Sequence, residues 1–360
     1  MEGALPSLSP KIRVTPGDLK LRALLEERRA PISVADFMAF ALQDPETGYY
    51  QKRLPLGRQG DFITAPEISP LFGEIVGAYL IHRWQEQERP RPFSLVELGP
   101  GRGTLMADIL RVASKVAPAF YEGARVHLIE RHPDLRRLQK DLIRHPHTTW
   151  HDGLETALNE PYPLFLVANE FFDALPIHQY EKGPHGWHER GVTLTGEGTF
   201  SWTLMSTEKS FDANGTFFES APLGHQIMAQ IFMHLERHGG SAFICDYGYE
   251  TGYADTLQGV KDHRYQGVLS YVGEVDLSAH VDFGSFLVQA KKHDIATRLM
   301  TQRDFLVENF LEDRINALMK TALSHAQKRT LQEGARRLTD PKEMGVLFKV
   351  LLLDATGKQP

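Results

Sequence analysis

Apolar runs alternate with helical stripes from residue 93 to residue 246. The runs are short, and the apolar ones among them are typical of buried parallel strands. Between the runs, apolar residues recur every three or four positions. The predicted strands are 94–98, 125–130, 148–151, 163–168 and 241–246. The predicted helices are 104–117, 133–143 and 222–238. This alternation predicts an α/β fold with a doubly wound parallel sheet.

The chain before residue 93 has the apolar spacing of helices. One apolar stripe consists of Val34, Phe37, Met38, Ala41 and Leu42. Ser33 is the expected N-cap of this helix. A second helix is expected to start with Ser69 as its N-cap and Pro70 at its first position, where a missing N–H costs nothing. We therefore expect residues 1–92 to form a helical N-terminal extension to a core of residues 93–360.

The alternation is interrupted once and then resumes. Residues 178–220 are rich in glycine between short β-prone pieces, which predicts an antiparallel insertion of β-hairpins within the core. Toward the C-terminus we expect a helix at 283–293, a strand at 295–300, one helix at 311–337 and a last strand at 345–353. The last strand is expected to close the sheet.

A glycine-rich turn follows the first predicted strand, with the order Glu97, Gly99, Pro100, Gly101 and Gly103. Glycines let a backbone adopt positive φ and approach a ligand closely, and the helix that follows offers free N–H groups. The spacing fits neither the dinucleotide fingerprint nor the phosphate-binding P-loop. It resembles the first motif of class I S-adenosylmethionine (SAM) methyltransferases.

Acidic residues follow the second and third strands, where ligands bind in open parallel sheets. Glu130 ends the second strand, and its carboxylate can accept hydrogen bonds from both ribose hydroxyls. Asp152 follows the third strand. It can accept from an adenine amino group or cap the helix that begins near Leu154, and the sequence leaves both roles open.

The fourth strand ends in a block from Asn169 to Pro176 that concentrates polar and aromatic side chains. Glu170 and Asp173 are three residues apart, so on a helical turn they share a face and suit a guanidinium acceptor. Asn169 stands beside them. A neighbouring phenylalanine can face a sulfonium by cation–π attraction, although core packing is the alternative for both rings. A capped turn with one solvated acid is the alternative for the carboxylates.

Composition excludes several classes of protein. The 360 residues include 40 basic and 46 acidic residues, a net charge of −6, whereas nucleic-acid binders are usually basic. No apolar run approaches the roughly 20 residues that span a bilayer. The N-terminal stretch has the features of neither a secretory signal nor a transit peptide. We therefore expect a cytoplasmic protein with no nucleic-acid partner and no direct membrane insertion.

Neither cysteine nor histidine forms a metal-binding motif. Cys245 is the single cysteine and lies in an apolar run, so a buried, inert thiol is expected. Among 16 histidines, the closest pairs are His145 with His147 and His185 with His188. Neither pair matches the His-Glu-x-x-His metal motif. No metal is expected.

Three stretches together resemble one family. They are the glycine turn, the Asn169–Pro176 block and the segment Gly60–Pro70. With them the chain resembles the MidA-type SAM-dependent methyltransferases, whose mitochondrial members are the complex I assembly-factor protein-arginine methyltransferases. Further matching stretches are Asp246–Gly248, 273–283 and 344–350. The resemblance covers about residues 31 to 353.

The resemblance implies a Rossmann-like class I methyltransferase core with SAM as donor. By position it assigns SAM binding to Glu97, Gly99, Gly101 and Gly103 and the ribose to Glu130. It sets Asn169 and Glu170 beside the methyl group, and we add Asp173 as the third catalytic residue. The implied activity is symmetric dimethylation of an arginine on a core subunit of complex I (NADH:quinone oxidoreductase). The resemblance places the eukaryotic relatives in the mitochondrial matrix. The missing transit peptide favours a bacterial relative.

Other functions stay open at this point. One is an assembly chaperone that binds SAM with little or no turnover. Another is a small-molecule N- or O-methyltransferase. A dinucleotide-dependent oxidoreductase is the alternative that the glycine spacing favours least. We expect the Gly60–Pro70 segment to fold over the SAM pocket as part of a lid, with ordinary packing of the extension as the alternative. The insertion at 178–220 is a candidate docking surface, since loops above a rigid sheet commonly carry recognition.

Overall fold

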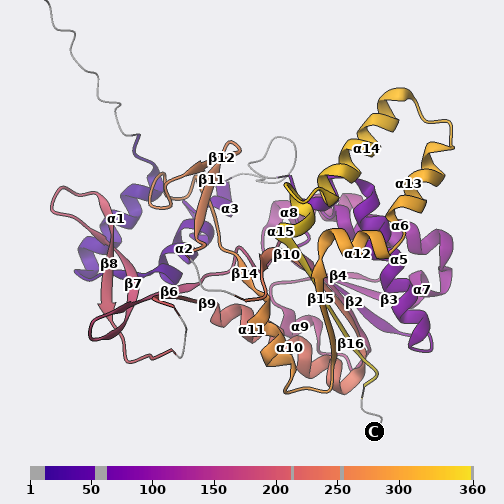
Figure 1. Cartoon of the computed structure of the whole chain (residues 1–360), viewed down its shortest axis with the longest axis horizontal. Coiled ribbons are helices and arrows are strands. Elements are labelled where there is room, and N and C mark those ends of the chain that lie inside the picture. Colours follow the sequence, from indigo (N-terminus) through magenta and orange to yellow (C-terminus); the bar gives the residue numbers. More distant parts are fainter. Residues whose placement is uncertain (1–12, 53–62, 212–214, 252–254, 358–360) are drawn as a thin grey trace, which may run out of the picture.

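The computed structural model describes residues 13–52, 63–211, 215–251 and 255–357. These residues form two lobes that lie side by side (Figure 1). The larger lobe contains a central sheet covered by helices on both faces, and the smaller lobe contains short helices packed on antiparallel strands. Within the described ranges no helix is long and apolar enough to cross a membrane.

The sheet of the larger lobe has the strand order β15-β16-β10-β5-β2-β3-β4. These strands are β2 (Phe93–Leu98), β3 (Ala124–Ile129), β4 (Thr148–His151), β5 (Leu164–Asn169), β10 (Gly240–Tyr249), β15 (Ala296–Thr301) and β16 (Phe348–Ala355). β16 runs antiparallel to both neighbours, whereas β10, β5, β2, β3 and β4 are paired in parallel. The five predicted core strands are therefore confirmed. The strand order reverses at β2, the position where such sheets bind ligands.

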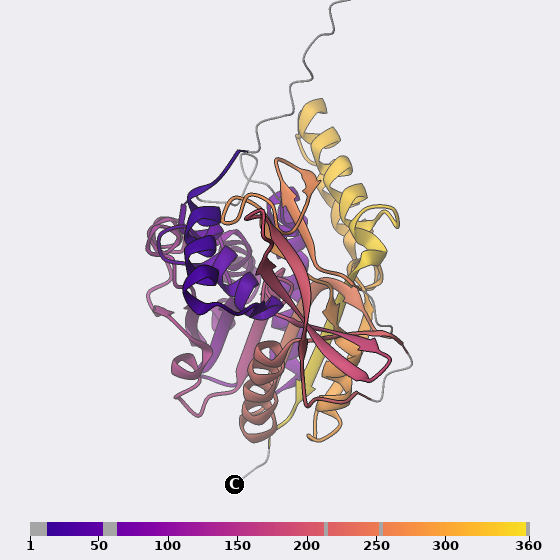
Figure 2. The ribbon, with the colours of Figure 1, turned by 90° about the vertical axis from the view of Figure 1, so that its left-hand side faces the viewer.

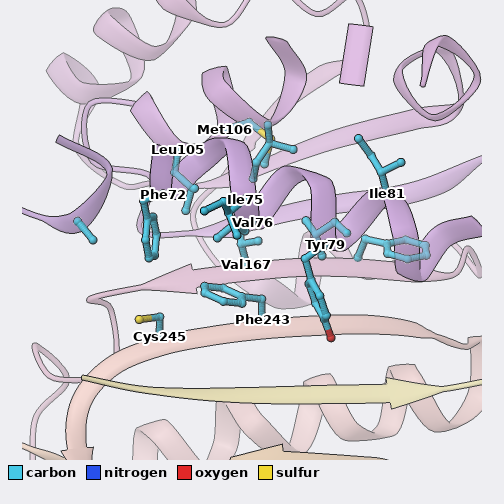
Figure 3. Packing of buried hydrophobic residues seen from close by; sticks show 14 of the residues in the cluster. Phe72, Ile75, Val76, Tyr79, Ile81, Leu105, Met106, Val167, Phe243 and Cys245 are labelled. Carbon is cyan, nitrogen blue, oxygen red and sulfur yellow. The ribbon is translucent and has the colours of Figure 1, made fainter. Parts of the chain in front are cut away.

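Helices cover both faces of this sheet. They are α4 (Ala65–Ile68), α5 (Pro70–Glu86), α6 (Thr104–Val116), α7 (Pro118–Gly123), α8 (Pro133–Leu142), α9 (Leu154–Ala157), α10 (Pro222–His238) and α11 (Phe283–Ala290). One hydrophobic cluster joins α5 and α6 to one face of the sheet, and Figure 3 shows Phe72, Ile75 and Tyr79 of α5 lying over Val167 and Phe243. A second cluster joins α9, α10 and α11 to the other face.

The smaller lobe combines two distant parts of the chain. Its elements are α1 (Pro16–Arg28), β1 (Ile32–Ser33), α2 (Val34–Gln43), α3 (Tyr49–Lys52), β6 (His178–Gly183), β7 (Gly186–Leu194), β8 (Phe200–Ser206) and β9 (Phe217–Ser220). β1 pairs antiparallel with β7, and Figure 2 shows α1 and α2 packed beside the hairpin strands. The predicted hairpins are present. The start of the chain packs against them, while α5 packs on the larger sheet.

A third small sheet lies at the junction of the two lobes. It consists of β11 (Gln258–Lys261), β12 (Arg264–Gln266) and β13 (Asp276–Ser278). β14 (Val281–Asp282) then pairs in parallel with the end of β10. Leu277 of β13 and Phe37 of α2 belong to the same hydrophobic cluster. The segment after β10 therefore connects the two lobes physically.

The expected single helix at 311–337 is wrong. The chain forms α12 (Gln302–Glu308), α13 (Leu311–Met319), α14 (His325–Thr339) and α15 (Met344–Leu347). Ser324 and Gln327 form a capping box in which each side chain accepts from the other's backbone N–H. Thr321 donates its hydroxyl to the Leu318 carbonyl at 2.7 Å. These local hydrogen bonds end α13 and start α14 without any glycine or proline.

The docking of α1 yields a stability prediction. A Cβ at Gly17 would lie 2.1 Å from the carbonyl oxygen of Val272, a backbone atom that cannot turn aside. We expect Gly17→Ala to lower the free energy of unfolding by about 1–3 kcal/mol through overpacking. Gly196→Ala is the control, because nothing lies within 4 Å of its Cβ position. Equal stability of the two variants in urea denaturation would show that this contact does not hold the lobe.

Candidate active site

A cavity lies at the carboxyl ends of β2 and β5, where the strand order reverses. Its lining residues are Thr64, Pro66, Glu67, Glu97, Gly99, Pro100, Gly101, Arg102, Thr104, Leu105, Asn169 and Glu170. The glycine turn, the end of the fourth core strand and the segment around α4 thus meet at one place. Of the predicted site residues, Glu130, Asp152 and Asp173 are not among those that line it.

The glycine turn has the backbone conformation that its glycines allow. Gly99, Gly101 and Gly103 have φ angles of 61°, 53° and 84°. Residues with a Cβ atom rarely adopt such positive φ angles. Gly103 is the N-cap of α6 and supplies no side-chain acceptor. The N–H groups at the start of α6 therefore need other partners, and Thr104 and Leu105 lie at the cavity wall.

Glu97 supplies one of these partners. Its side chain is buried, and its carboxylate accepts a hydrogen bond from the backbone N–H of Met106 in the first turn of α6. Its Oε2 atom is buried and has no hydrogen-bond partner. Burial, opposed by that hydrogen bond and helped by the charge of Glu130, raises the pKa of Glu97 to about 8. A cationic group in the cavity would satisfy the orphaned oxygen.

Glu130 lies beside the turn and is linked to it by Gln139 of α8. Gln139 is fully buried and donates to the Gly101 carbonyl at 2.7 Å and, more weakly, to Glu130 Oε2 at 3.4 Å. Its Oε1 accepts from Trp150 Nε1 at 2.8 Å. The sequence analysis missed Gln139. Gln139 lies four residues after the buried Leu135 and therefore on the same face of the helix. That spacing is the sequence signal from which its burial could have been predicted.

Asp152 points to solvent. Its side chain is 82% exposed and forms an ion pair with Arg136 at 2.5 Å. It does not cap α9, since Gly153 is the N-cap of that helix and no side-chain capping bond forms there. The adenine role proposed for Asp152 stays a prediction.

The turn after β5 is held by one carboxylate. Asp246 of β10 is fully buried, and its Oδ2 accepts from the backbone N–H groups of Phe171, Phe172 and Asp173 at 3.1, 3.0 and 3.2 Å. Glu170 has φ of 51°, a conformation that costs a non-glycine residue roughly 1–3 kcal/mol. The hydrogen bonds to Asp246 fix this strained turn. Asp246 ends a predicted strand, so the rule that collects strand ends could have identified it.

Glu170 and Asn169 point to the cavity from this turn. Glu170 Oε1 accepts from Asn169 Nδ2 at 3.1 Å and from the backbone N–H of Ala65 at 3.0 Å. Asn169 is 9% exposed, and its Oδ1 is buried without a partner. The oxygen of a buried amide is therefore available to a donor in the cavity.

Three carboxylates cluster at the turn with little positive charge around them. Burial and the charge of Asp173 raise the pKa of Glu170 to about 7, and burial raises the pKa of Asp173 to about 6. Burial and both neighbouring carboxylates raise the pKa of Asp246. Among the main causes of these shifts in the described residues, the positive charge that contributes is that of Arg337, which lowers the pKa of Glu170. Because buried acids favour a cationic neighbour, the cluster suits a positively charged ligand.

The two phenylalanines of the block pack within the protein. A Cβ at Gly99 would lie 2.8 Å from Phe171 Cδ2, so this ring lies directly under the glycine turn. Phe172 is buried against Phe286, with ring centroids 5.3 Å apart. Neither ring is among the residues that line the cavity. Core packing therefore describes Phe172, and a sulfonium contact of the half-buried Phe171 stays a prediction.

The segment around α4 closes one side of the cavity. Thr64, Pro66 and Glu67 line it, and Glu67 forms an ion pair with Arg102 of the glycine turn at 3.4 Å. Of the expected lid, Gly60–Phe62 lie outside the described residues. The remainder contacts both the glycine turn and Glu170, and its role as a lid stays a prediction.

The cavity fits SAM on the chemistry of its walls. A backbone turn with positive φ, a helix start with open N–H groups and two orphaned buried oxygens, on Glu97 and Asn169, meet there. These groups suit the amine and carboxylate of a zwitterionic amino acid and an adjacent cation. Within the described residues no group of three or more His, Cys, Asp or Glu side chains could hold a metal ion.

The glycine turn yields a binding prediction. A valine at position 101 would sit at φ of 53° and displace the turn, because β-branched residues avoid this region. We expect Gly101→Val to weaken SAM binding more than about tenfold in calorimetry, through loss of the backbone cradle. Gly198→Val is the matched control, since Gly198 has φ of 76° in the hairpin between β7 and β8. The idea fails if both variants bind SAM alike.

The chain is similar in sequence to one family over most of its length. A family model described as "Putative S-adenosyl-L-methionine-dependent methyltransferase" matches residues 75–300. The mitochondrial protein arginine methyltransferase NDUFAF7 of Danio rerio is 32% identical over 348 residues, covering 89% of this chain and 82% of that protein. The human protein of the same name is 31% identical, covering 90% of this chain and 80% of its own. The Drosophila melanogaster homolog is 33% identical, with coverage of 97% and 87%.

Solved structures share the fold. A Burkholderia thailandensis protein bound to S-adenosyl-homocysteine has a TM-score of 0.81 and 24% identity, covering 95% of this chain and 92% of that chain. A native crystal structure from the same organism has a TM-score of 0.79 and 23% identity, with coverage of 95% and 92%. These likenesses confirm the predicted Rossmann-like class I fold. Together with the family match, they show that the chain belongs to the SAM-dependent methyltransferase family that its motifs resemble.

Proposed function

We propose that this methyltransferase transfers methyl groups to an arginine side chain of a protein, with a core subunit of complex I as the acceptor. Three relatives named protein arginine methyltransferases support the arginine. The complex I subunit and symmetric dimethylation come from the family resemblance of the motifs. The observation that carries the proposal is the placement of carboxylates at the cavity: Glu170 lines it, and the buried Asp173 follows on the same turn, held in place by Asp246.

The carboxylates suit a guanidinium in charge. The predicted helical turn is absent, because Glu170 has φ of 51°, so the two acids do not share a helix face. A guanidinium offers planar N–H donors that pair with carboxylates and stays charged at neutral pH. Glu170 lines the cavity, and Asp173 follows it on the same turn. We assign to them the orientation of the acceptor nitrogen, which is the main requirement of an in-line displacement. Asn169 holds the Glu170 carboxylate through its amide N–H.

SAM supplies an electrophilic methyl group on a sulfonium. As the acceptor nitrogen gains a carbon, it must lose a proton. Glu170, with a pKa raised by burial to about 7, can accept a proton near neutral pH and is the proposed general base.

The remaining residues are assigned to SAM itself. We assign the cation to Glu97, the ribose to Glu130 and the adenine amino group to Asp152. The backbone cradle is assigned to the glycine turn, which is Gly99, Pro100, Gly101 and Gly103. The segment around α4 is the proposed lid.

Transfer of a labelled methyl group tests this function. The protein is incubated with radiolabelled SAM and a lysate of cells that lack it, and labelled proteins are mapped by mass spectrometry. We expect label on an arginine, and Glu170→Gln should slow the transfer by about 10²–10⁴-fold through loss of the base. Glu197→Gln is the control, because Glu197 is exposed in the hairpin between β7 and β8.

Each other outcome identifies a different function. Label on a small molecule would overturn the protein acceptor, and label on another amino acid would overturn the arginine. SAM binding without any labelled acceptor would favour an assembly chaperone. Equal rates for Glu170→Gln and Glu197→Gln would remove Glu170 from the mechanism.

A further inference from the structure

A polar cluster crosses the junction of the two lobes. It lies next to the turn after β5 that carries Glu170 and Asp173, which we call the acidic turn. Tyr50 of α3 donates its hydroxyl to Asp276 Oδ1 of β13 at 3.3 Å. Tyr247 of β10 donates its hydroxyl to Asp173 Oδ2 at 2.6 Å. Burial and the charges of Asp276 and Asp173 raise the pKa of Tyr50 well above its usual value. The Tyr50 hydroxyl therefore stays protonated, and both carboxylates act on it electrostatically.

In the smaller lobe, Tyr50 packs against its neighbour in the hydrophobic cluster. Tyr49 packs edge-on against Tyr50, with centroids 5.2 Å apart, and belongs to the same hydrophobic cluster as Leu277 of β13. The backbone N–H of Ala279 donates to the Asp173 carbonyl at 2.9 Å. The segment that carries Asp276 is thus tied directly to the turn that carries Asp173.

The cluster has buried acceptors that the protein leaves unused. Asp173 is 9% exposed, and its Oδ1 has no hydrogen-bond partner. Asn169, equally buried, has an unpartnered Oδ1 and lines the cavity. A buried acceptor without a donor is destabilising, and a ligand with several N–H donors removes that cost.

We propose that Tyr50 of the smaller lobe and Asp276 of the junction sheet complete the acceptor site begun by Asp173, and that they select a cationic guanidinium side chain. This inference rests on the proposed function and extends it. The larger lobe then binds the donor, and the smaller lobe together with the junction sheet determines which acceptor is used. Neither Tyr50 nor Asp276 lines the cavity assigned to SAM.

The test separates acceptor binding from donor binding in the full-length protein. Asp276→Asn keeps the shape of the side chain and removes its charge. We expect the lysate concentration that gives half-maximal methylation to rise about tenfold or more, because removing one charge of a desolvated pair weakens binding of the acceptor. SAM affinity, measured by calorimetry, should stay within about twofold, because donor binding does not use this charge. Asp313→Asn on the exposed side of α13 is the matched control.

A second variant protects the test against a folding defect. Tyr50→Phe removes only a hydroxyl, and we expect a smaller rise in half-saturation with SAM affinity unchanged. If both variants match the control in half-saturation, or if both lose SAM affinity in parallel, the inference is overturned. A wild-type reaction that labels no arginine would overturn the proposed function itself, and this inference with it. Label on arginine with unaffected variants overturns this inference alone.

Discussion

One buried carboxylate organises the site. Asp246 accepts three consecutive backbone N–H groups and thereby fixes the turn that follows β5, including the positive φ of Glu170. This arrangement presents Asn169 and Glu170 to the cavity and keeps Asp173 beside them. It also gathers three carboxylates where burial disfavours their charge. The fold bears that electrostatic cost at the place where a cationic ligand would remove it.

The same arrangement explains why two lobes are present. The sheet reverses its strand order at β2, which sets the glycine turn next to the acidic turn. The first provides backbone donors and the second provides negative charge, so together they suit a zwitterionic donor and a cationic acceptor. The N-terminal segment contributes from two directions. Its α4 region contacts Glu170 and Arg102, and its α3 region carries Tyr50 beside Asp276.

Sequence patterns predicted what depends on local order along the chain. The five core strands and the convergence of Glu97 with Asn169 and Glu170 follow from apolar periodicity and from the rule that ligands bind at strand ends. Gln139 escaped because an isolated glutamine in a helix resembles a solvated residue until its neighbours are known. The sequence analysis named Asp246 only as part of the stretch Asp246–Gly248 that resembles the family. Its structural role was not predicted, because the backbone N–H groups that it binds lie more than 70 residues earlier in the chain. The pairing of β1 with β7 and the break between α13 and α14 depend on tertiary contacts and on side-chain capping, which apolar periodicity does not encode.

The central claim is that the buried carboxyl groups of the site bind a cationic ligand. Proton release on SAM binding tests this claim directly. Burial raises the pKa values of Glu97 and Glu170 to about 8 and 7, so at pH 7 Glu97 is mostly and Glu170 partly protonated, whereas Asp173, with a pKa raised to about 6, is largely ionised. A bound cation favours their charged forms and expels those protons. Calorimetric titration with SAM at pH 7 in buffers of different ionisation enthalpy should show release of about half a proton or more per SAM. Binding without proton release, or with proton uptake, would contradict this account.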